Sequence, residues 1–160
     1  MNKVWEETQK NGYSFVKNNR AIGTLEIVDT ARDIKAYATL GADVYAIRSV
    51  GFWKTNLEVL TSRGQVVARI FQKKWYSNDL LVEYRGYSYV LKLRNRPLAE
   101  WVLLDQETEV LTYSLVINNN KAGVRIESRS AHSDDLLDFL LWYLFVPFLV
   151  DTSGDALVLV

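Results

Sequence analysis

Residues 134–151, DDLLDFLLWYLFVPFLVD, form the most apolar stretch of the chain and decide its fold. From Phe139 to Val150 there are twelve consecutive residues without a charge. A membrane-spanning helix needs about 20 apolar residues, whereas about 10–14 are typical of a buried core helix. No basic cluster flanks the run to orient it across a membrane. We therefore expect a helix buried in the protein; a membrane anchor and an interfacial helix or strand are the alternatives.

Polar residues mark the start of this helix. Ser133, followed by Asp134 and Asp135, supplies an N-cap and negative charge at the positive end of the helix dipole. Pro147 is expected to end or kink the helix, which we predict at residues of about 134–147. Almost every position within the run is apolar, and a helix that is apolar on all sides must be surrounded on all sides.

Short β-strands are predicted over most of the remaining chain, with turn residues such as Asn18-Asn19-Arg20 and Arg85-Gly86 between them. In residues 87–94 apolar and aromatic residues alternate with polar ones, with Val90 as the one exception, which places Lys92 and Arg94 on one outer face. Residues 31–39 are ambiguous between a helical turn and a strand. The predicted strands cover 13–17, 21–27, 44–50, 55–61, 65–75, 80–84, 87–94, 101–104, 110–117 and 122–128.

Strands at this density are typical of a barrel or a sandwich. A barrel that closes around the apolar helix satisfies both patterns. We therefore predict one domain over residues 1–160, mainly β, in which an antiparallel barrel surrounds one C-terminal core helix. Asp138 is then expected at the barrel mouth, near the helix N-terminus, where a carboxylate is favoured. Trp53, Trp101 and Trp142 fit core positions on strands and helix.

The order of elements resembles the tubby C-terminal-like superfamily, which includes tubby domains, phospholipid scramblases and LURP-one-related proteins. The likeness lies in two hairpin units and the helix, and it covers the chain from about Trp5 to Val150. It implies a closed barrel of about twelve strands around a central hydrophobic helix, in a small, prokaryotic-type member. No tubby phosphoinositide-binding motif or scramblase calcium-binding segment matches, so neither activity carries over. The residues concerned are VYAIRSVGFW (44–53), LEVLTSRGQVVARI (57–70), LLVEYRGYSYVLKLR (80–94), WVLLDQETEVLTYSL (101–115) and DLLDFLLWYLFVPFL (135–149).

The composition excludes several kinds of chemistry. The absence of cysteine excludes disulfides, thiolate metal sites and a cysteine nucleophile. The single histidine, His132, lies beside Ser130 and Asp134, but such close sequence neighbours rarely form a catalytic triad, and no nucleophile elbow is present. The isolated glycines form no phosphate-binding loop. We predict a protein that is not an enzyme and needs no cofactor or metal.

Charge is unevenly distributed, although the net charge of the chain is zero. Residues 63–96 hold eight basic and two acidic residues, a net charge of +6, whereas residues 97–160 are acidic. Lysines beside aromatic residues, as in KKWYSND (73–79), suit an anionic membrane interface. They would also suit stacking of nucleic-acid bases, which we favour less. The candidate residues for contact with lipid or another ligand are Lys73, Lys74, Trp75, Lys92, Arg94 and Arg96.

The sequence thus predicts a non-enzymatic binding module that meets anionic lipid headgroups or an acidic protein through its basic segment. We expect it in the cytoplasm, peripheral at the membrane if it binds lipid. One alternative is a structural or assembly protein, in which the acidic surface of one chain meets the basic surface of another. A second alternative is a lipocalin-like carrier of a small ligand, which requires a hollow barrel.

Overall fold

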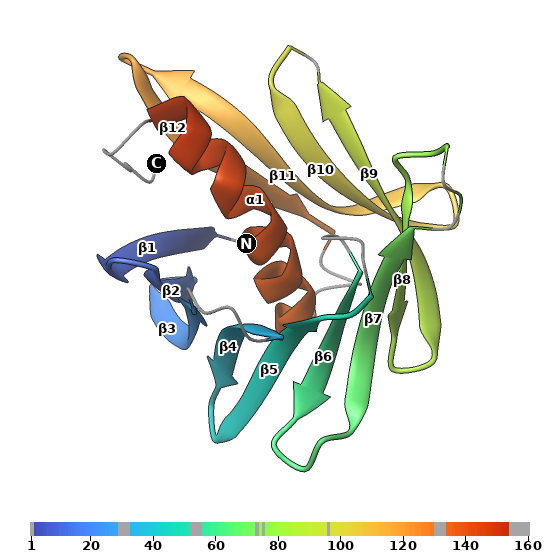
Figure 1. Cartoon of the computed structure of the whole chain (residues 1–160). Helices are drawn as coiled ribbons and strands as arrows, with labels where there is room; N and C mark the ends of the chain where they lie inside the picture. Colours follow the sequence, from blue (N-terminus) through green and yellow to red (C-terminus); the bar gives the residue numbers. More distant parts are fainter. Residues whose placement is uncertain are drawn as a thin grey trace.

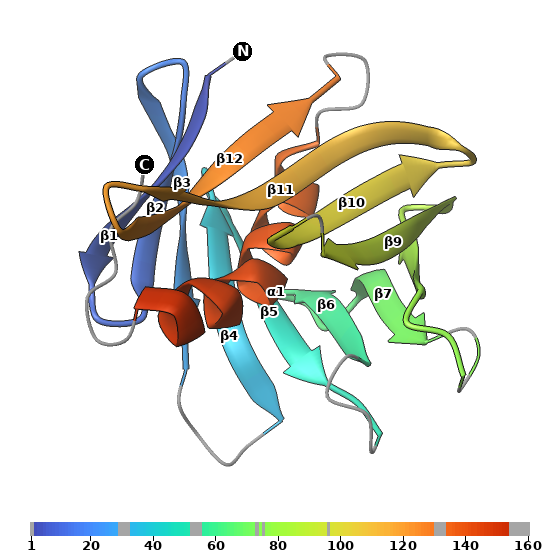
Figure 2. The same cartoon turned by 90° about the horizontal axis from the view of Figure 1, so that it is seen from above.

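Twelve antiparallel strands and one helix make up the described part of the chain, in a computed structural model that covers residues 2–28, 33–51, 56–72, 74, 76–95, 97–129 and 134–153. Each strand pairs with the next, so the sheet follows the order of the sequence from β1 to β12. The sheet curls into a nearly closed barrel with the helix α1 inside it (Figure 1, Figure 2). The predicted fold class is confirmed.

The elements have these bounds: β1 Lys3–Gln9, β2 Gly12–Lys17, β3 Arg20–Ile27, β4 Ile34–Leu40, β5 Asp43–Ser49, β6 Leu57–Thr61, β7 Val66–Gln72, β8 Leu80–Tyr84, β9 Tyr87–Asn95, β10 Ala99–Asp105, β11 Thr108–Asn118, β12 Lys121–Ser128 and α1 Asp135–Ser153. Residues 34–39 of the segment that was ambiguous in sequence belong to strand β4, whereas residues 31 and 32 lie outside the described residues. Trp101 and Trp142 are buried as predicted, whereas Trp53 lies outside the described residues.

Tight turns explain why successive strands are neighbours. Both central residues have positive φ in the turns at Asn18-Asn19, Arg85-Gly86 and Asn119-Asn120. Two-residue hairpin turns of type I′ require this conformation, which asparagine and glycine adopt most readily. The turns that the sequence predicted at Asn18 and Arg85 are confirmed.

The first half of α1 is enclosed on every side. Seven consecutive residues, 136–142, are buried, which is the pattern predicted for a helix surrounded by a barrel. Trp142 of the helix stacks on Trp5 of β1, with ring centroids 5.2 Å apart and ring planes 3° from parallel. Because the helix and the inward-facing side chains occupy the barrel axis, this packing counts against a hollow, lipocalin-like carrier.

The predicted end of the helix was wrong. Helix α1 continues past Pro147 to Ser153. Proline has no backbone N–H, so the carbonyl of Tyr143, four residues earlier, has no helical donor. Pro147 is exposed, so this carbonyl lies on the partly open side of the helix. Val150 and Asp151 are exposed too, which shows that the last turns leave the barrel on one side. No helix in the described ranges has the length and apolar character needed to cross a membrane.

The helix start also differs in detail from the prediction. Asp134 caps it, since the backbone N–H of Leu136 donates a hydrogen bond of 3.1 Å to Asp134 Oδ1. Ser133 and the tail Ala156–Val160 lie outside the described residues. Asp138 is fully buried, so the prediction that it lies at the barrel mouth was wrong.

Close packing around the helix requires a glycine on β3. A Cβ atom at Gly23 would overlap the backbone carbonyl of Thr39 on β4 and lie 3.1 Å from the ring of Phe139 on α1. Because the obstacle is backbone, it cannot move aside as a flexible side chain could. Gly23 therefore allows β3, β4 and the helix to approach one another.

Candidate functional site

Three of the six predicted contact residues lie on one outer surface of the barrel. Lys92 and Arg94 project from the outer face of β9, as the alternation predicted, and Lys74 lies in the β7–β8 loop, residues 73–79. Lys73, Trp75 and Arg96 are outside the described residues. We call the outer side of β8, β9 and β10, together with the described part of this loop, the β8–β10 face.

Two adjoining hollows mark the β8–β10 face. A hollow of about 440 Å³ is lined by residues that include Lys92, Arg94, Gln106 and Glu107. A smaller one of about 210 Å³ is lined by residues that include Lys74. Asp79 and Val90 belong to both linings, so the two hollows are neighbours, and together they are lined by the three described candidate residues.

Nearby carboxylates balance the cations of this face. Lys92 Nζ lies 3.8 Å from Asp79 Oδ2. Arg94 donates a hydrogen bond of 2.6 Å to Glu109 Oε1, and its Nη1 lies 3.9 Å from Glu100 Oε1. The acidic partners of Arg94 come from β10 and β11, outside the basic segment. The charge of +6 in residues 63–96 therefore does not appear as an equally strong positive surface.

Lys74, which lies beside the ring of Tyr76, differs from these paired cations. Both side chains are exposed, Tyr76 to 67%. The Lys74 ammonium lies 5.6 Å from the centroid of the Tyr76 ring, within the range of a cation–π contact. Lys74 forms no ion pair with any residue in the described part of the chain.

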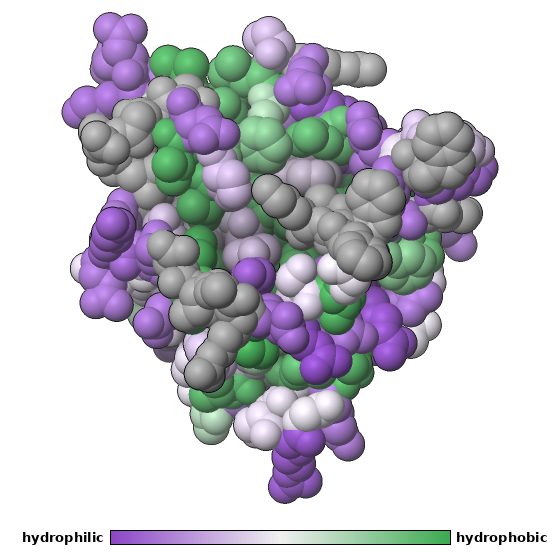
Figure 3. Space-filling view, viewed as in Figure 1, coloured by the Kyte–Doolittle hydropathy of each residue, from purple (hydrophilic) through white to green (hydrophobic). Residues whose placement is uncertain are grey.

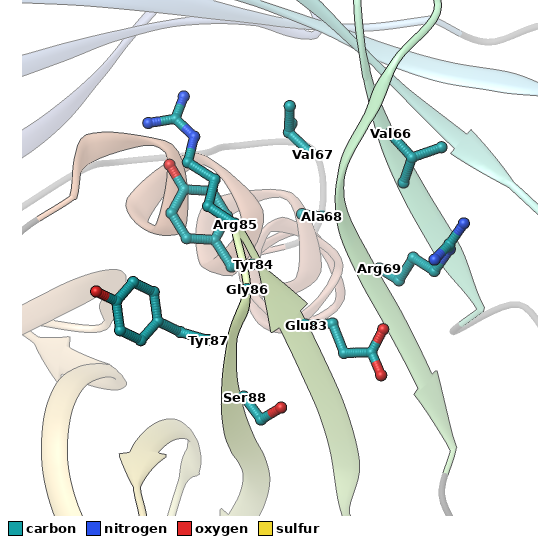
Figure 4. Close-up of a pocket in the computed structure, with 10 residues that line it drawn as sticks. All are labelled: Val66, Val67, Ala68, Arg69, Glu83, Tyr84, Arg85, Gly86, Tyr87 and Ser88. Atoms are coloured by element: carbon teal, nitrogen blue, oxygen red, sulfur yellow. The ribbon is translucent and has the colours of Figure 1, made fainter.

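Another hollow, of about 410 Å³, surrounds the β8–β9 turn. Figure 4 shows Arg69 and Glu83 on one side of the paired strands β7 and β8, with Tyr84, Arg85 and Tyr87 on the other. Glu58 accepts hydrogen bonds from Arg48 and Arg69, which lower its pKa. Glu58 lies outside the lining, but Arg69, Glu83 and Arg85 belong to it, so this hollow also contains both cations and a carboxylate.

Arg85 connects this hollow to the helix. Its Nη1 lies 3.6 Å from Asp134 Oδ2, and its Nη2 donates a hydrogen bond of 3.4 Å to the Tyr45 hydroxyl. Its guanidinium carbon lies 5.1 Å from the centroid of the Tyr84 ring. Burial and the nearby Asp134 carboxylate raise the pKa of Tyr84. These contacts explain why an arginine occupies a position with positive φ, where a side chain is strained.

A buried polar network at the helix start was not found by sequence reasoning. Lys3 Nζ donates a hydrogen bond of 2.9 Å to Asp138 Oδ2, and the Tyr113 hydroxyl donates one of 2.8 Å to Asp138 Oδ1. Trp5 Nε1 in turn donates a hydrogen bond of 2.8 Å to the Tyr113 oxygen. The network therefore joins β1, β11 and α1 in the barrel core.

Burial governs the protonation of this network. The Lys3 and Asp138 side chains are only 2% and 1% exposed. Loss of hydration raises the pKa of Asp138, although the charge of Lys3 and the hydrogen bonds from Lys3 and Tyr113 oppose that shift. Burial and the neighbouring Asp138 carboxylate also raise the pKa of Tyr113. The hydrogen bonds of this network join β1, β11 and α1 and so hold the fold together. Because the network is closed to solvent, it offers no binding surface.

The two other acidic residues of the helix start also meet cations from the barrel. Lys17 of β2 donates a hydrogen bond of 3.0 Å to Asp135 Oδ1, and Arg85 lies beside Asp134. Asp134, Asp135 and Asp138 are thus held by cations from the β8–β9 turn, from β2 and from β1. The only signal in the sequence was the group of acidic residues itself, because nothing in the sequence assigns their distant partners.

Several sequence features cannot be placed. His132 and Ser130 lie outside the described residues. Among the described residues, no three histidine, aspartate or glutamate side chains gather in a way that could hold a metal ion.

Figure 3 shows hydrophilic residues mainly around the outline of one face, with hydrophobic residues between them.

Comparison with known proteins gives no relative: no family model, no curated protein and no solved structure matches the chain. The resemblance to the tubby C-terminal-like superfamily therefore stays a prediction that rests on the order of elements. The fold itself is that of a helix-filled, nearly closed antiparallel barrel.

Proposed function

We propose that this chain is a non-enzymatic binding module that attaches peripherally to anionic lipid headgroups through the β8–β10 face. The observation that carries the proposal is the exposed pair Lys74 and Tyr76 beside the hollow that contains Lys92 and Arg94. An aromatic ring suits the level of the headgroups, and each lysine or arginine near an anionic surface contributes about 1 kcal/mol.

The ion pairs on this face rank its cations. Lys74 has no carboxylate partner among the described residues, so its charge is available to a phosphate group. Lys92 and Arg94 already lie beside Asp79 and Glu109, and a headgroup would have to compete with these carboxylates. We therefore expect Lys74 to contribute more to binding than Lys92 and Arg94.

A protein partner is the second candidate, and one observation favours it. Cations and carboxylates alternate on the β8–β10 face, and such a mixed surface can match a partner of complementary pattern, which gives specificity. In that case the protein acts as a structural or assembly component through protein–protein contacts.

Co-sedimentation with vesicles tests the lipid proposal. Vesicles of phosphatidylcholine alone are compared with vesicles that also contain phosphatidylserine, at low and at high salt. We expect binding only to the anionic vesicles, and loss of that binding at high salt, because salt screens exposed charges. Absence of binding to either vesicle would overturn the lipid proposal and leave the protein partner.

Matched charge reversals locate the surface. Lys74→Glu should weaken binding strongly, Lys92→Glu should weaken it less, and Lys121→Glu should leave it unchanged. Lys121 begins β12, on the opposite side of the molecule from the β7–β8 loop, and it is exposed (Figure 1, Figure 2). Equal losses in all three variants would show that binding depends on total charge and not on the β8–β10 face.

A further inference from the structure

The contact between Lys3 and Asp138 is close and closed to solvent. The amine nitrogen is hydrogen-bonded to the carboxyl group at 2.9 Å, and both side chains are almost completely inaccessible to solvent. The surroundings are aromatic: Trp5 stacks on Trp142 and lies edge-on to Phe139. An amine and a carboxyl group are thus held together in a site without bulk water.

Burial favours the uncharged form of such a pair. Moving the shared proton from nitrogen to oxygen turns an ammonium and a carboxylate into an amine and a carboxylic acid, with no net change in protons. Separated charges lose their hydration in a core, so the neutral form gains relative to the ion pair. A neutral amine is a nucleophile, and a carboxylic acid can be attacked at its carbon, whereas a carboxylate resists attack.

We propose that Lys3 and Asp138 join in an intramolecular isopeptide bond. The Lys3 nitrogen attacks Cγ of the protonated Asp138 carboxyl group and forms a tetrahedral intermediate. One carboxyl oxygen then leaves with two protons as water, and the nitrogen keeps one hydrogen in the resulting amide. The step needs no oxidant, reductant or other co-reactant, since one amine and one acid give one amide and one water.

Tyr113 is placed to assist this step. Its hydroxyl donates to Asp138 Oδ1, while the Lys3 nitrogen is at Oδ2, so the oxygen bound by Tyr113 is the one that remains as the amide carbonyl. A donor at that oxygen stabilises the negative charge that develops during attack. Trp5 donates to the Tyr113 oxygen and therefore fixes its orientation.

The position of the bond gives it a structural purpose. β1 is the first strand of the sheet and pairs only with β2 in the described strand order. The bond would tie this terminal strand to the core helix across 135 residues of sequence. Closing so long a loop restricts the unfolded chain strongly, by the same argument that applies to a disulfide. This inference is independent of the proposed binding function.

Intact-mass measurement of the denatured protein tests the bond. The wild-type chain should be lighter than its sequence by one water molecule. Trypsin should not cleave after Lys3, because the amide removes the charge of its side chain. Residues 1–10 should therefore be joined to residues 130–160, which stay in one piece because no lysine or arginine follows Arg129. A folded wild-type protein with the full sequence mass and a free peptide ending at Lys3 would overturn the proposal.

Two variants separate this bond from other losses of water. Lys3→Arg keeps the positive charge but removes the reactive amine, so it should have its full sequence mass. Tyr113→Phe keeps both reacting groups and removes only the donor, so a smaller fraction of the freshly expressed protein should have lost water. If Lys3→Arg shows the same loss of water as the wild type, the dehydration lies elsewhere and the proposal is wrong.

Discussion

The pair Lys3–Asp138 in the core and the pair Lys92–Asp79 on the β8–β10 face join the same two residue types but differ in environment. The first pair is almost fully buried with a hydrogen bond of 2.9 Å, and the second is exposed with 3.8 Å between its charged atoms. Water solvates each member of the exposed pair whether or not the other is present. In the core neither side chain is hydrated, so each depends on its partner, and the buried pair matters far more for folding than the exposed pair.

Tyr113 adds to this difference. It donates a second hydrogen bond to Asp138, so the buried carboxylate has a donor on each oxygen. Removing one member of a buried pair typically costs about 3–5 kcal/mol, whereas an exposed pair contributes about 0–1 kcal/mol. The comparison therefore predicts which charges the fold requires and which are free to serve binding.

The largest effect is expected from a buried charge that has no partner. Leu141→Asp places a carboxylate in the enclosed half of α1, one turn after Asp138 but without its donors. We expect no soluble folded protein, because burying an unpaired charge costs several kcal/mol. Val150→Asp is the control, since Val150 is 46% exposed on the same helix. Circular dichroism and expression level measure the outcome, and a folded Leu141→Asp protein would contradict a buried α1.

The next effect concerns the buried pair itself. Asp138→Ala leaves Lys3 as a buried cation, and we expect a loss of about 3–5 kcal/mol in the free energy of unfolding. A covalent bond between the two residues would increase this loss, because the bond also restricts the unfolded chain. Urea denaturation gives the value. A loss of less than about 1 kcal/mol, the value typical of an exposed pair, would show that the core network does not hold the helix in place.

The pH dependence of the stability of the Lys3→Met variant tests the buried pair in a second way. Burial raises the pKa of Asp138, and removing Lys3 removes the charge that most opposes this shift. A carboxyl group whose pKa is higher in the folded protein than in the unfolded chain favours folding at low pH and loses that contribution as the pH rises through the folded pKa. The gap in stability between the variant and the wild type should therefore be smaller at about pH 4.5 than at about pH 7. Urea denaturation at both pH values measures the gap, and an equal gap would contradict the buried pair.

The smallest effect is expected on the outer face. Lys92→Ala should change the free energy of unfolding by less than about 1 kcal/mol, because both partners of this pair are exposed. The same measurement in urea checks it. A loss as large as that of Asp138→Ala would remove the distinction between the two regions.

Local patterns were sufficient to predict most of the barrel. The alternation in residues 87–94 gave the two faces of β9, and positive-φ turn residues gave the hairpins. The all-apolar run gave a buried helix because no other arrangement covers every side of it. Strand β1 was missed, because its inward side carries Lys3 as well as Trp5 and shows no simple apolar alternation.

Partners that are distant in sequence could not be predicted. Asp138 was recognised as unusual, but Lys3 lies 135 residues away, and no local pattern relates the two. The same limit applied to the basic segment, where the acidic partners of Arg94 come from β10 and β11. A charge count over a segment describes a surface only when the fold keeps other segments away from it.

Native-state hydrogen exchange of α1 tests most directly the claim that the barrel folds around its helix. We predict that the amides of the enclosed residues, 140–142, exchange only when the whole protein unfolds, with the same free energy as the central barrel strands. Exchange of these amides at a much lower free energy, while the strands stay protected, would mean that the helix leaves an intact barrel. That result would contradict the account.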